Sequence, residues 1–145
     1  MAPKYTKIIP SLPVSSVPEA INFYTNVLGF RVAGRDRDDH TWLQLASEES
    51  ENKYDVAVNV YLRRRGFPDL QDDAHFGKIY VRLGEGEGEL ESLLESVRSK
   101  GATIRNEITT KPWGLKDFTI TDLDGNQINF SQAIFGNGLP PAQTS

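Results

Sequence analysis

The sequence has 145 residues, which is enough for one domain or for two half-domains that share a core. Hydrophobic residues make up 38% and charged residues 25%, a balance typical of globular proteins rather than disordered chains. The sequence contains no cysteine, no signal-peptide pattern, and no apolar run near the ~20 residues of a membrane span. We therefore expect a cytoplasmic protein that does not bind membranes, and its net charge of −4 disfavours nucleic acid as a partner.

The first half of the chain is predicted to form a strand, a helix and three further strands. The first strand is expected at residues 4–10, with Pro10 and Pro13 indicating an edge or irregular position. Ser16 and Glu19 match a capping box at the start of a helix that ends near Gly29. The following strands are predicted at residues 30–35, 40–46 and 54–62.

The second half of the chain repeats this order. A strand is predicted at residues 78–83, and Leu90, Leu93, Leu94 and Val97 form a helical stripe before Gly101. Later strands are predicted at 103–108, 118–121 and 127–130, with Asp-Gly in the last turn predicting a β-hairpin. The fold class is therefore α+β.

The repeat predicts two βαβββ modules at about residues 4–62 and 75–131. Both lie in one domain spanning residues 1–135, and residues 136–145 are expected to be a flexible tail rich in glycine, proline and polar residues.

The faces of the predicted strands indicate where a ligand would bind. Each helix must bury its apolar stripe, and one face of the strands is apolar enough to receive it. The opposite face carries polar and aromatic residues, namely Gln44, Asn59, Tyr61, Lys78, Tyr80, Arg82, Gln127 and Asn129. If the sheet curls, this face lines a cleft with aromatic walls, as in many small-ligand sites. The alternatives are a solvated face or one buried in a dimer.

Two motifs of the sequence resemble a known family. Residues 14–24 read VSSVPEAINFY and are followed by VLGF at residues 27–30, while residues 112–114 read PWG and residues 122–126 read DLDGN. This combination resembles the glyoxalase/bleomycin resistance, or vicinal oxygen chelate, superfamily. The resemblance implies paired βαβββ modules in a curled mixed sheet with a concave cleft, and often a homodimer.

The resemblance also implies three positions for metal ligands, which are His, Gln or Glu in the enzymes of the superfamily. Here these positions hold Ile9, Lys78 and Asn129. An aliphatic side chain, an ammonium and an amide do not make a divalent metal site. His40 and His75 lie beside acidic residues and leave a non-standard site open, but exposed loop histidines are commoner. We expect no metal and no cofactor, which disfavours a metal-dependent lyase, isomerase or dioxygenase.

Among metal-free members, the chain looks most similar to bleomycin resistance proteins, which sequester a planar cationic antibiotic. That resemblance makes Trp113 the first candidate for ligand stacking; alternatively, this residue covers the edge of the hairpin. Trp42 and Tyr61 are further candidates on physical grounds.

Lys78 and Arg82 on the same predicted face suit an anionic or carbonyl-rich ligand better than a cationic one. The predicted ligand-binding residues are Trp113, Trp42, Tyr61, Asn59, Lys78, Tyr80, Arg82 and Asn129. Two other classes stay open: a metal-free enzyme with Lys78 as acid, base or electrophile, and a dimeric scaffold or immunity partner without a small ligand.

Overall fold

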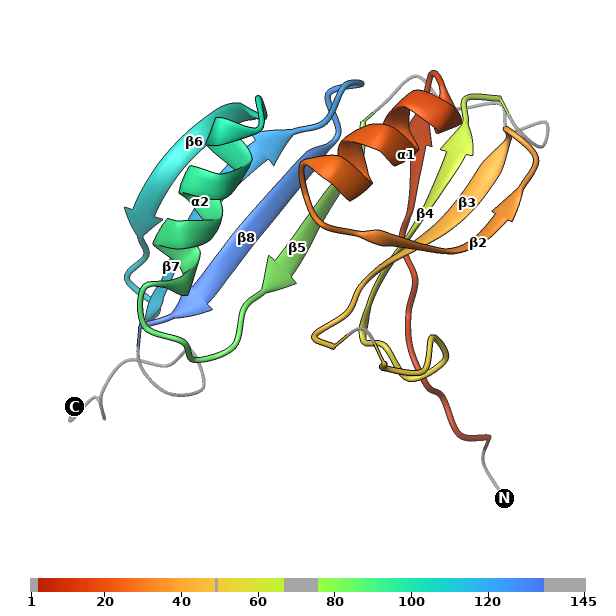
Figure 1. Ribbon diagram of the computed structural model, residues 1–145. Coiled ribbons are helices and arrows are strands. Elements are labelled where there is room, and N and C mark those ends of the chain that lie inside the picture. Colours follow the sequence, from red (N-terminus) through yellow and green to blue (C-terminus); the bar gives the residue numbers. More distant parts are fainter. Residues whose placement is uncertain (1–2, 49, 67–75, 135–145) are drawn as a thin grey trace. The chain divides into compact units, whose positions relative to one another are not determined.

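The computed structural model describes residues 3–48, 50–66 and 76–134, and it divides into two compact units (Figure 1). Module 1 lies within Met1–His75 and module 2 within Phe76–Ser145. In chain order the elements are β1 (Ser11–Val14), α1 (Val17–Asn26), β2 (Arg31–Asp36), β3 (His40–Leu45), β4 (Val58–Arg64), β5 (Lys78–Arg82), α2 (Glu89–Ser99), β6 (Thr103–Thr110), β7 (Leu115–Thr121) and β8 (Gln127–Ala133). In the described parts of the chain, no helix is long and apolar enough to cross a membrane.

Both modules have the predicted βαβββ order, and each forms its own four-stranded mixed sheet. The strand order is β1-β4-β3-β2 in module 1 and β5-β8-β7-β6 in module 2. In each sheet the first strand pairs in parallel with the last, and the remaining pairs are antiparallel. The α+β class predicted from the repeat is confirmed.

The first strand was predicted too early in the chain. β1 occupies Ser11–Val14, whereas residues 4–10 do not form a strand. The carbonyl oxygens of Pro10 and Val14 accept hydrogen bonds from the amides of Tyr61 and Arg65 in the β4 region, at 2.8 and 2.9 Å. Pro13, between them, faces away from β4 by the alternation of a strand. Its missing N–H therefore costs no hydrogen bond to β4, and proline is tolerated in this terminal strand of the sheet.

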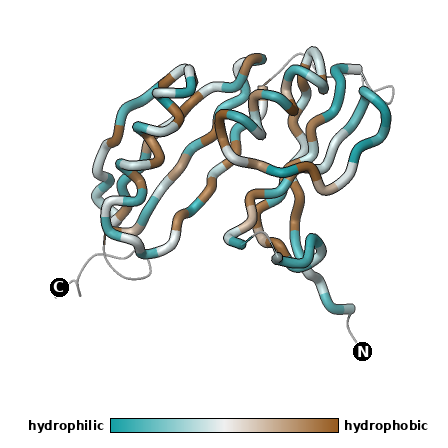
Figure 2. The backbone as a smooth tube through the Cα atoms, viewed as in Figure 1, coloured by the Kyte–Doolittle hydropathy of each residue, from teal (hydrophilic) through white to brown (hydrophobic). Residues whose placement is uncertain are grey.

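Helix α1 begins and ends as its sequence predicts. The Ser16 hydroxyl accepts a hydrogen bond from the amide of Glu19 at 3.3 Å, so it caps one exposed donor of the first turn. Gly29 follows the helix with φ of +82°, a conformation in which the amide of Phe30 reaches the Tyr24 carbonyl at 2.9 Å. Apolar residues recur along one side of the helix (Figure 2), and its buried residues are Val17, Ala20, Phe23 and Tyr24.

Strand β4 begins at Val58, later than the predicted residue 54. The Asn52 side chain accepts from the amide of Tyr54 at 2.9 Å, and the Asn52 carbonyl accepts from the amide of Asp55 at 2.8 Å. This asparagine turn competes with an extended conformation. Residues 52–55 are therefore an irregular connection, although Val56 beyond them is already in the core at 1% exposure.

Module 2 buries the stripe of α2 against its sheet. Leu90, Leu94 and Val97 are buried on the helix, and the helix ends before Gly101 with φ of +91°. The large buried side chains of the sheet are Phe118, Ile120, Ile128 and Phe130. The rings of Phe118 and Phe130 lie on paired positions of β7 and β8, with centroids 5.4 Å apart.

The predicted hairpin between β7 and β8 is confirmed, and its turn is held by a buried carboxylate. Asp122 is 7% exposed and accepts hydrogen bonds from the amides of Asp124 and Asn126, both at 2.9 Å, and from Asn126 Nδ2 at 3.0 Å. Asn126 Oδ1 in turn accepts from the amide of Gly77 at 2.8 Å. The turn therefore fixes the start of β5 as well as the hairpin.

Candidate functional site

The polar face of module 1 is formed by side chains that the strand register places beside one another. Trp42 on β3 pairs with Tyr61 on β4, and Gln44 pairs with Asn59. The residues between them, Leu43 and Val60, are fully buried. Because side chains alternate along a strand, this pairing places the three module 1 residues predicted to bind ligand on one face.

Asn59 is the centre of a hydrogen-bond network on this face. Its Oδ1 atom accepts from Trp42 Nε1 at 2.8 Å and from Gln44 Nε2 at 3.0 Å, while its Nδ2 atom donates to the Val56 carbonyl at 2.7 Å. Asn59 is 6% exposed and Gln44 is fully buried. The network fixes the plane of the Trp42 indole, so the geometry gives Asn59 a positioning function in addition to the predicted ligand contact.

Two aromatic pairs border this network. The rings of Trp42 and Tyr54 have centroids 6.0 Å apart, and Lys53 Nζ lies 5.7 Å from the first ring and 5.4 Å from the second. His40 and Tyr61 form the other pair, with centroids 4.9 Å apart. Module 1 therefore supplies aromatic surfaces at two neighbouring places on the same face.

The polar face of module 2 presents its cations on strand β5. Lys78, Tyr80 and Arg82 alternate along the strand and are exposed, Tyr80 at 70%. Lys78 Nζ lies 5.0 Å from the centroid of the Tyr80 ring. The strand thus offers an aromatic side chain between two positive charges, an arrangement that suits a flat ligand with negative or carbonyl oxygen atoms.

Asn129 lies next to the row of Lys78, Tyr80 and Arg82 on β5, which we call the β5 ladder, but Asn129 itself is buried. The register pairs Asn129 with Tyr80 on one side and with Thr119 on the other, and its Nδ2 atom donates to Thr119 Oγ1 at 3.0 Å. Asn129 is 4% exposed, and Ser131, also buried, accepts from Arg82 Nε at 3.0 Å. Asn129 and Ser131 therefore lie on β8 beside the β5 ladder, and Ser131 positions Arg82 through its hydrogen bond.

Trp113 lies in the connection between β6 and β7 and is 57% exposed. A turn holds this connection, because the amide of Gly114 donates to the Lys111 carbonyl at 3.1 Å and that of Lys111 to the Leu115 carbonyl at 2.6 Å. Gly114 has φ of +90°. The turn presents the indole to solvent at an end of the module 2 sheet; its contact with a ligand stays a prediction.

The sequence decides the family. The sequence model of the Glyoxalase/Bleomycin resistance protein/Dioxygenase superfamily matches residues 8–130, which include both modules and the Asp122–Asn126 turn. The chain belongs to this superfamily. None of the curated proteins matches the sequence.

Solved structures of other superfamily proteins share the fold. TioX from Micromonospora sp. ML1 is 20% identical with a TM-score of 0.69, over 89% of this chain and 99% of TioX. A glyoxalase/bleomycin resistance protein/dioxygenase from Nocardioides is 16% identical with a TM-score of 0.67, over 99% and 93% of the two chains. A glyoxalase-related enzyme from Clostridium phytofermentans is 17% identical with a TM-score of 0.67, over 90% and 97%. At these identities the likeness establishes the fold alone.

The residues at the three expected metal-ligand positions do not fit a divalent metal. Ile9 has no donor atom, Lys78 is an exposed cation, and the Asn129 amide nitrogen donates to Thr119. His40 lies against Tyr61, and His75 is outside the described residues. Within residues 3–48, 50–66 and 76–134, no group of three or more His, Cys, Asp or Glu side chains could hold a metal ion.

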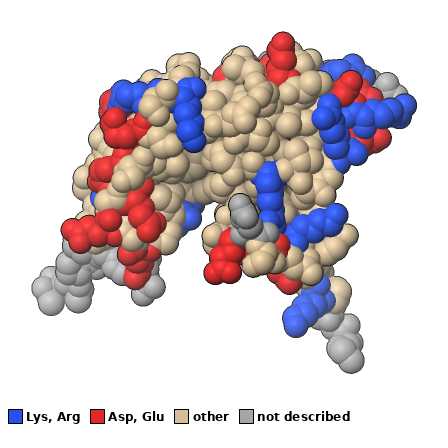
Figure 3. Space-filling view, viewed as in Figure 1, with Lys and Arg blue, Asp and Glu red and all other residues tan. Residues whose placement is uncertain are grey.

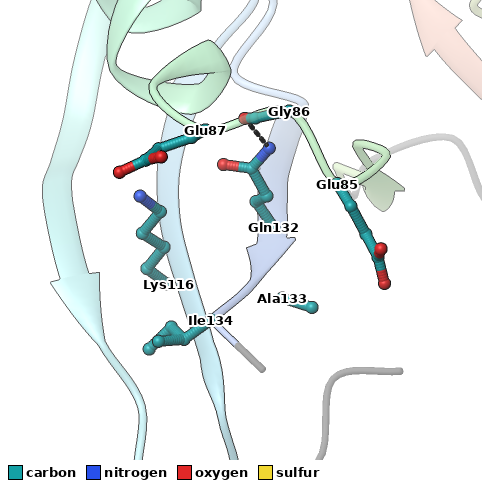
Figure 4. A pocket seen from close by; sticks show the side chains of 7 residues that line it. All are labelled: Glu85, Gly86, Glu87, Lys116, Gln132, Ala133 and Ile134. Atoms are coloured by element: carbon teal, nitrogen blue, oxygen red, sulfur yellow. Dashed lines mark hydrogen bonds between the residues drawn. The ribbon is translucent and has the colours of Figure 1, made fainter. Parts of the chain in front are cut away.

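A cavity of about 430 Å³ in module 2 has none of the predicted site residues in its lining (Figure 4). It is lined by Glu85, Gly86, Glu87, Lys116, Gln132, Ala133 and Ile134. Gln132 Nε2 donates to the carbonyls of Gly84 and Gly86 at 2.8 and 2.6 Å, so this side chain fastens the chain between β5 and α2. Lys116, another lining residue, donates to Glu91 of α2 at 2.7 Å.

The shifted pKa values belong to ion pairs outside the polar faces. A hydrogen bond from Lys116 at 2.7 Å lowers the pKa of the Glu91 carboxyl. Arg98 donates to both carboxylate oxygens of Glu107, at 3.1 and 2.5 Å, which lowers the pKa of Glu107 and raises the pKa of Arg98. These pairs join α2 to β7 and β6 and are structural.

Sequence reasoning missed the contribution of Arg31 and of the segment before β4. Arg31 Nη2 donates to Gln44 Oε1 at 3.4 Å and to the Glu51 carbonyl at 2.9 Å, and Gln44 Nε2 donates to the Lys53 carbonyl. Arg31 itself could have indicated this contact, because it is a charged residue at the start of β2 and pairs with Gln44 on the polar face of the sheet. The path of residues 51–55 had no signal in the alternation of the strands.

Proposed function

We propose that this protein binds a planar, anionic or carbonyl-rich small molecule without a metal ion. The observation that carries the proposal is the exposed Lys78–Tyr80–Arg82 ladder on β5, in which two cations flank an aromatic ring. A flat aromatic ligand can stack on Tyr80 while its oxygen atoms accept from Lys78 and Arg82. Trp113 is proposed as a further stacking residue.

The distribution of charge in module 2 supports an anionic ligand at this face. Acidic side chains gather on the α2 side of the module (Figure 3), where they are Glu85, Glu87, Glu89, Glu91 and Glu95. The polar face instead carries Lys78 and Arg82. The glutamates disfavour an anion near α2, and the two cations favour one at the strand face, where the nearby carboxylate of Asp117 lies 3.8 Å from Lys111 Nζ. Salt weakens both effects.

Sequestration of a cationic antibiotic such as bleomycin, and with it a role in antibiotic resistance, is the less favoured form of this proposal. The bound ligand would then meet two positive charges on β5. A cytoplasmic location and a homodimer, expected from the sequence and from the family resemblance, belong to the same proposal. They are tested by cell fractionation and by the mass of the purified protein in solution.

Isothermal titration tests the proposed ligand class. We expect 2-naphthoate to bind the protein. The neutral analogue 2-naphthamide and the cationic drug bleomycin should both bind more weakly than 2-naphthoate. Replacing both cations, Lys78→Gln with Arg82→Gln, should weaken 2-naphthoate about fivefold, because exposed charge contacts together contribute about 1 kcal/mol. The matched control replaces Lys100 and Arg105, exposed cations elsewhere in module 2. Micromolar binding of bleomycin, or equal binding of 2-naphthoate to both double variants, contradicts the proposal.

The second candidate is an enzyme of the same superfamily acting on a small carbonyl or aromatic substrate. A metal-free version would use Lys78, the ladder's first cation. Its exposed position lacks the apolar surroundings that make a lysine a catalytic base. Conversion of a carbonyl substrate that is lost in Lys78→Gln and kept in Lys100→Gln would favour this candidate over binding alone.

A further inference from the structure

Residues 51–55 of module 1 lie on its polar face. Their backbone carbonyls accept hydrogen bonds from side chains of the sheet. The Glu51 carbonyl accepts from Arg31 Nη2 at 2.9 Å, and the Lys53 carbonyl accepts from Gln44 Nε2. Gln44 is fully buried beneath this contact. A guanidinium and a primary amide therefore converge on two oxygen atoms that come from an irregular connection rather than from a strand.

The same connection covers the aromatic surface beside these donors. The Tyr54 ring lies against Trp42, with centroids 6.0 Å apart, and Lys53 Nζ lies 5.7 Å from the Trp42 ring centroid. The Trp42 indole is held in place from behind by its hydrogen bond to Asn59. Two oxygen atoms and an aromatic ring are also what an aromatic carboxylate would bring to this place.

The connection is attached by hydrogen bonds and by the Tyr54 ring contact, and none of its side chains is buried in the apolar core. The side chains of residues 52–55 are exposed, Tyr54 at 66%, and the segment belongs to no strand or helix. Its other contacts within the described residues include Lys7 Nζ donating to the Tyr54 carbonyl at 2.8 Å and Lys53 Nζ donating to the Ala33 carbonyl at 3.3 Å. Segments with exposed backbone contacts and little buried apolar surface open locally at low cost. Val56, 1% exposed, anchors its end.

We propose that residues 51–55 are a displaceable plug over a second binding site, whose ligand is a planar aromatic carboxylate. With the plug displaced, the carboxylate accepts from Arg31 and Gln44 in place of the two backbone carbonyls, and the ring stacks on Trp42 in place of Tyr54. This site lies in module 1 and uses none of the β5 residues. It stands or falls independently of the function proposed above.

Limited proteolysis with trypsin tests the plug in the Lys78→Gln, Arg82→Gln background, which removes the β5 cations. Trypsin cleaves after Lys53, inside the plug. We expect saturating 2-naphthoate to accelerate this cleavage severalfold relative to other tryptic sites, because ligand binding releases the segment. Slower or unchanged cleavage at Lys53 overturns the proposal, because a ligand elsewhere, or one that tightens the segment, gives that result.

Two variants in the same background identify the contacts by titration with 2-naphthoate. Tyr54→Ala should raise the affinity about threefold, since apparent affinity follows the fraction of molecules whose site is open. Arg31→Gln should lower it about tenfold, whereas Arg37→Gln, an 81% exposed control side chain, should not change it. Circular dichroism checks folding. Equal affinity of Arg31→Gln and Arg37→Gln, or no binding to Tyr54→Ala at millimolar ligand, overturns the proposal.

Discussion

Replacing Asp122 with alanine should destabilise module 2 strongly. Its carboxylate is 7% exposed and accepts from two backbone amides and from Asn126 Nδ2 at 2.9 to 3.0 Å. Asn126 is fully buried, so its amide cannot turn to water when the carboxylate is removed. The same asparagine holds the amide of Gly77, one residue before Lys78. Loss of the carboxylate therefore affects both the hairpin and the first residue of the β5 ladder.

The three contacts set the size of the effect. A hydrogen bond to a charged group contributes about 1.5–3 kcal/mol, and neighbouring bonds are not additive. We therefore expect the free energy of unfolding to fall by about 3–5 kcal/mol in Asp122→Ala. In Asp122→Asn one oxygen remains for the backbone amides, while the new NH₂ group faces the Asn126 donor. That variant should lose about 1–2 kcal/mol.

Urea unfolding followed by circular dichroism measures these changes through the midpoint, provided that the slope with denaturant is unchanged. The control is Asp38→Ala. The Asp38 side chain is 75% exposed, and its replacement removes a surface ion pair with Arg35. It should change stability by less than about 1 kcal/mol. If Asp122→Ala resembles Asp38→Ala, the turn does not stabilise module 2 in the way described.

Two further predictions concern module 2. Gly125→Ala should lower the free energy of unfolding, measured in urea, more than Gly101→Ala does. Both glycines have φ above +90°, but of the two only Gly125 would place the new Cβ 3.1 Å from the Phe76 ring. Equal effects of the two substitutions would contradict this. The lowered pKa of Glu91 implies stability that is present above the usual carboxyl pKa and lost as pH falls through the folded value. Lys116→Gln should therefore be less stable than the wild type at pH 7 and converge with it in acid, and a constant gap at all pH values would contradict this.

The regular elements could be predicted because local chemistry decides them. The Ser16 cap, the apolar stripes of both helices and the Asp-Gly turn each specify their structure within a few residues. The prediction of the hairpin from Gly125 held because its φ of +92° is accessible to glycine at little cost. The α+β fold then follows from the repeated order of these elements.

The misplaced boundaries result from interactions that the chain pattern does not contain. A first strand is predicted at residues 4–10, yet β1 forms at Ser11–Val14, where its carbonyls reach β4. Likewise, alternation from residue 54 onwards predicts strand, but the Asn52 side chain ends the extended path by capping the amide of Tyr54. The boundary of β1 therefore depends on a partner strand distant in sequence, whereas the Asn52 turn is a local contact that the alternation of apolar residues does not reveal.

For the candidate site, the sequence predicts which face of the sheet each residue lies on, but not whether its side chain is exposed. Alternation correctly places Asn59 and Asn129 opposite the helices, but both are buried and bonded to neighbouring side chains. By contrast, Tyr80 and Trp113 are exposed. The sequence names the side chains of a face; only the structure shows which of them are engaged by Trp42, Thr119 or the backbone.

Metal analysis of the purified protein tests the central claim of metal-free binding most directly. Inductively coupled plasma mass spectrometry after dialysis against buffer containing zinc, nickel, manganese and iron counts metal ions per chain. With Ile9, Lys78 and Asn129 at the expected ligand positions, we predict far less than one ion per chain. One bound ion per chain, retained through a second dialysis without metal, would contradict the account.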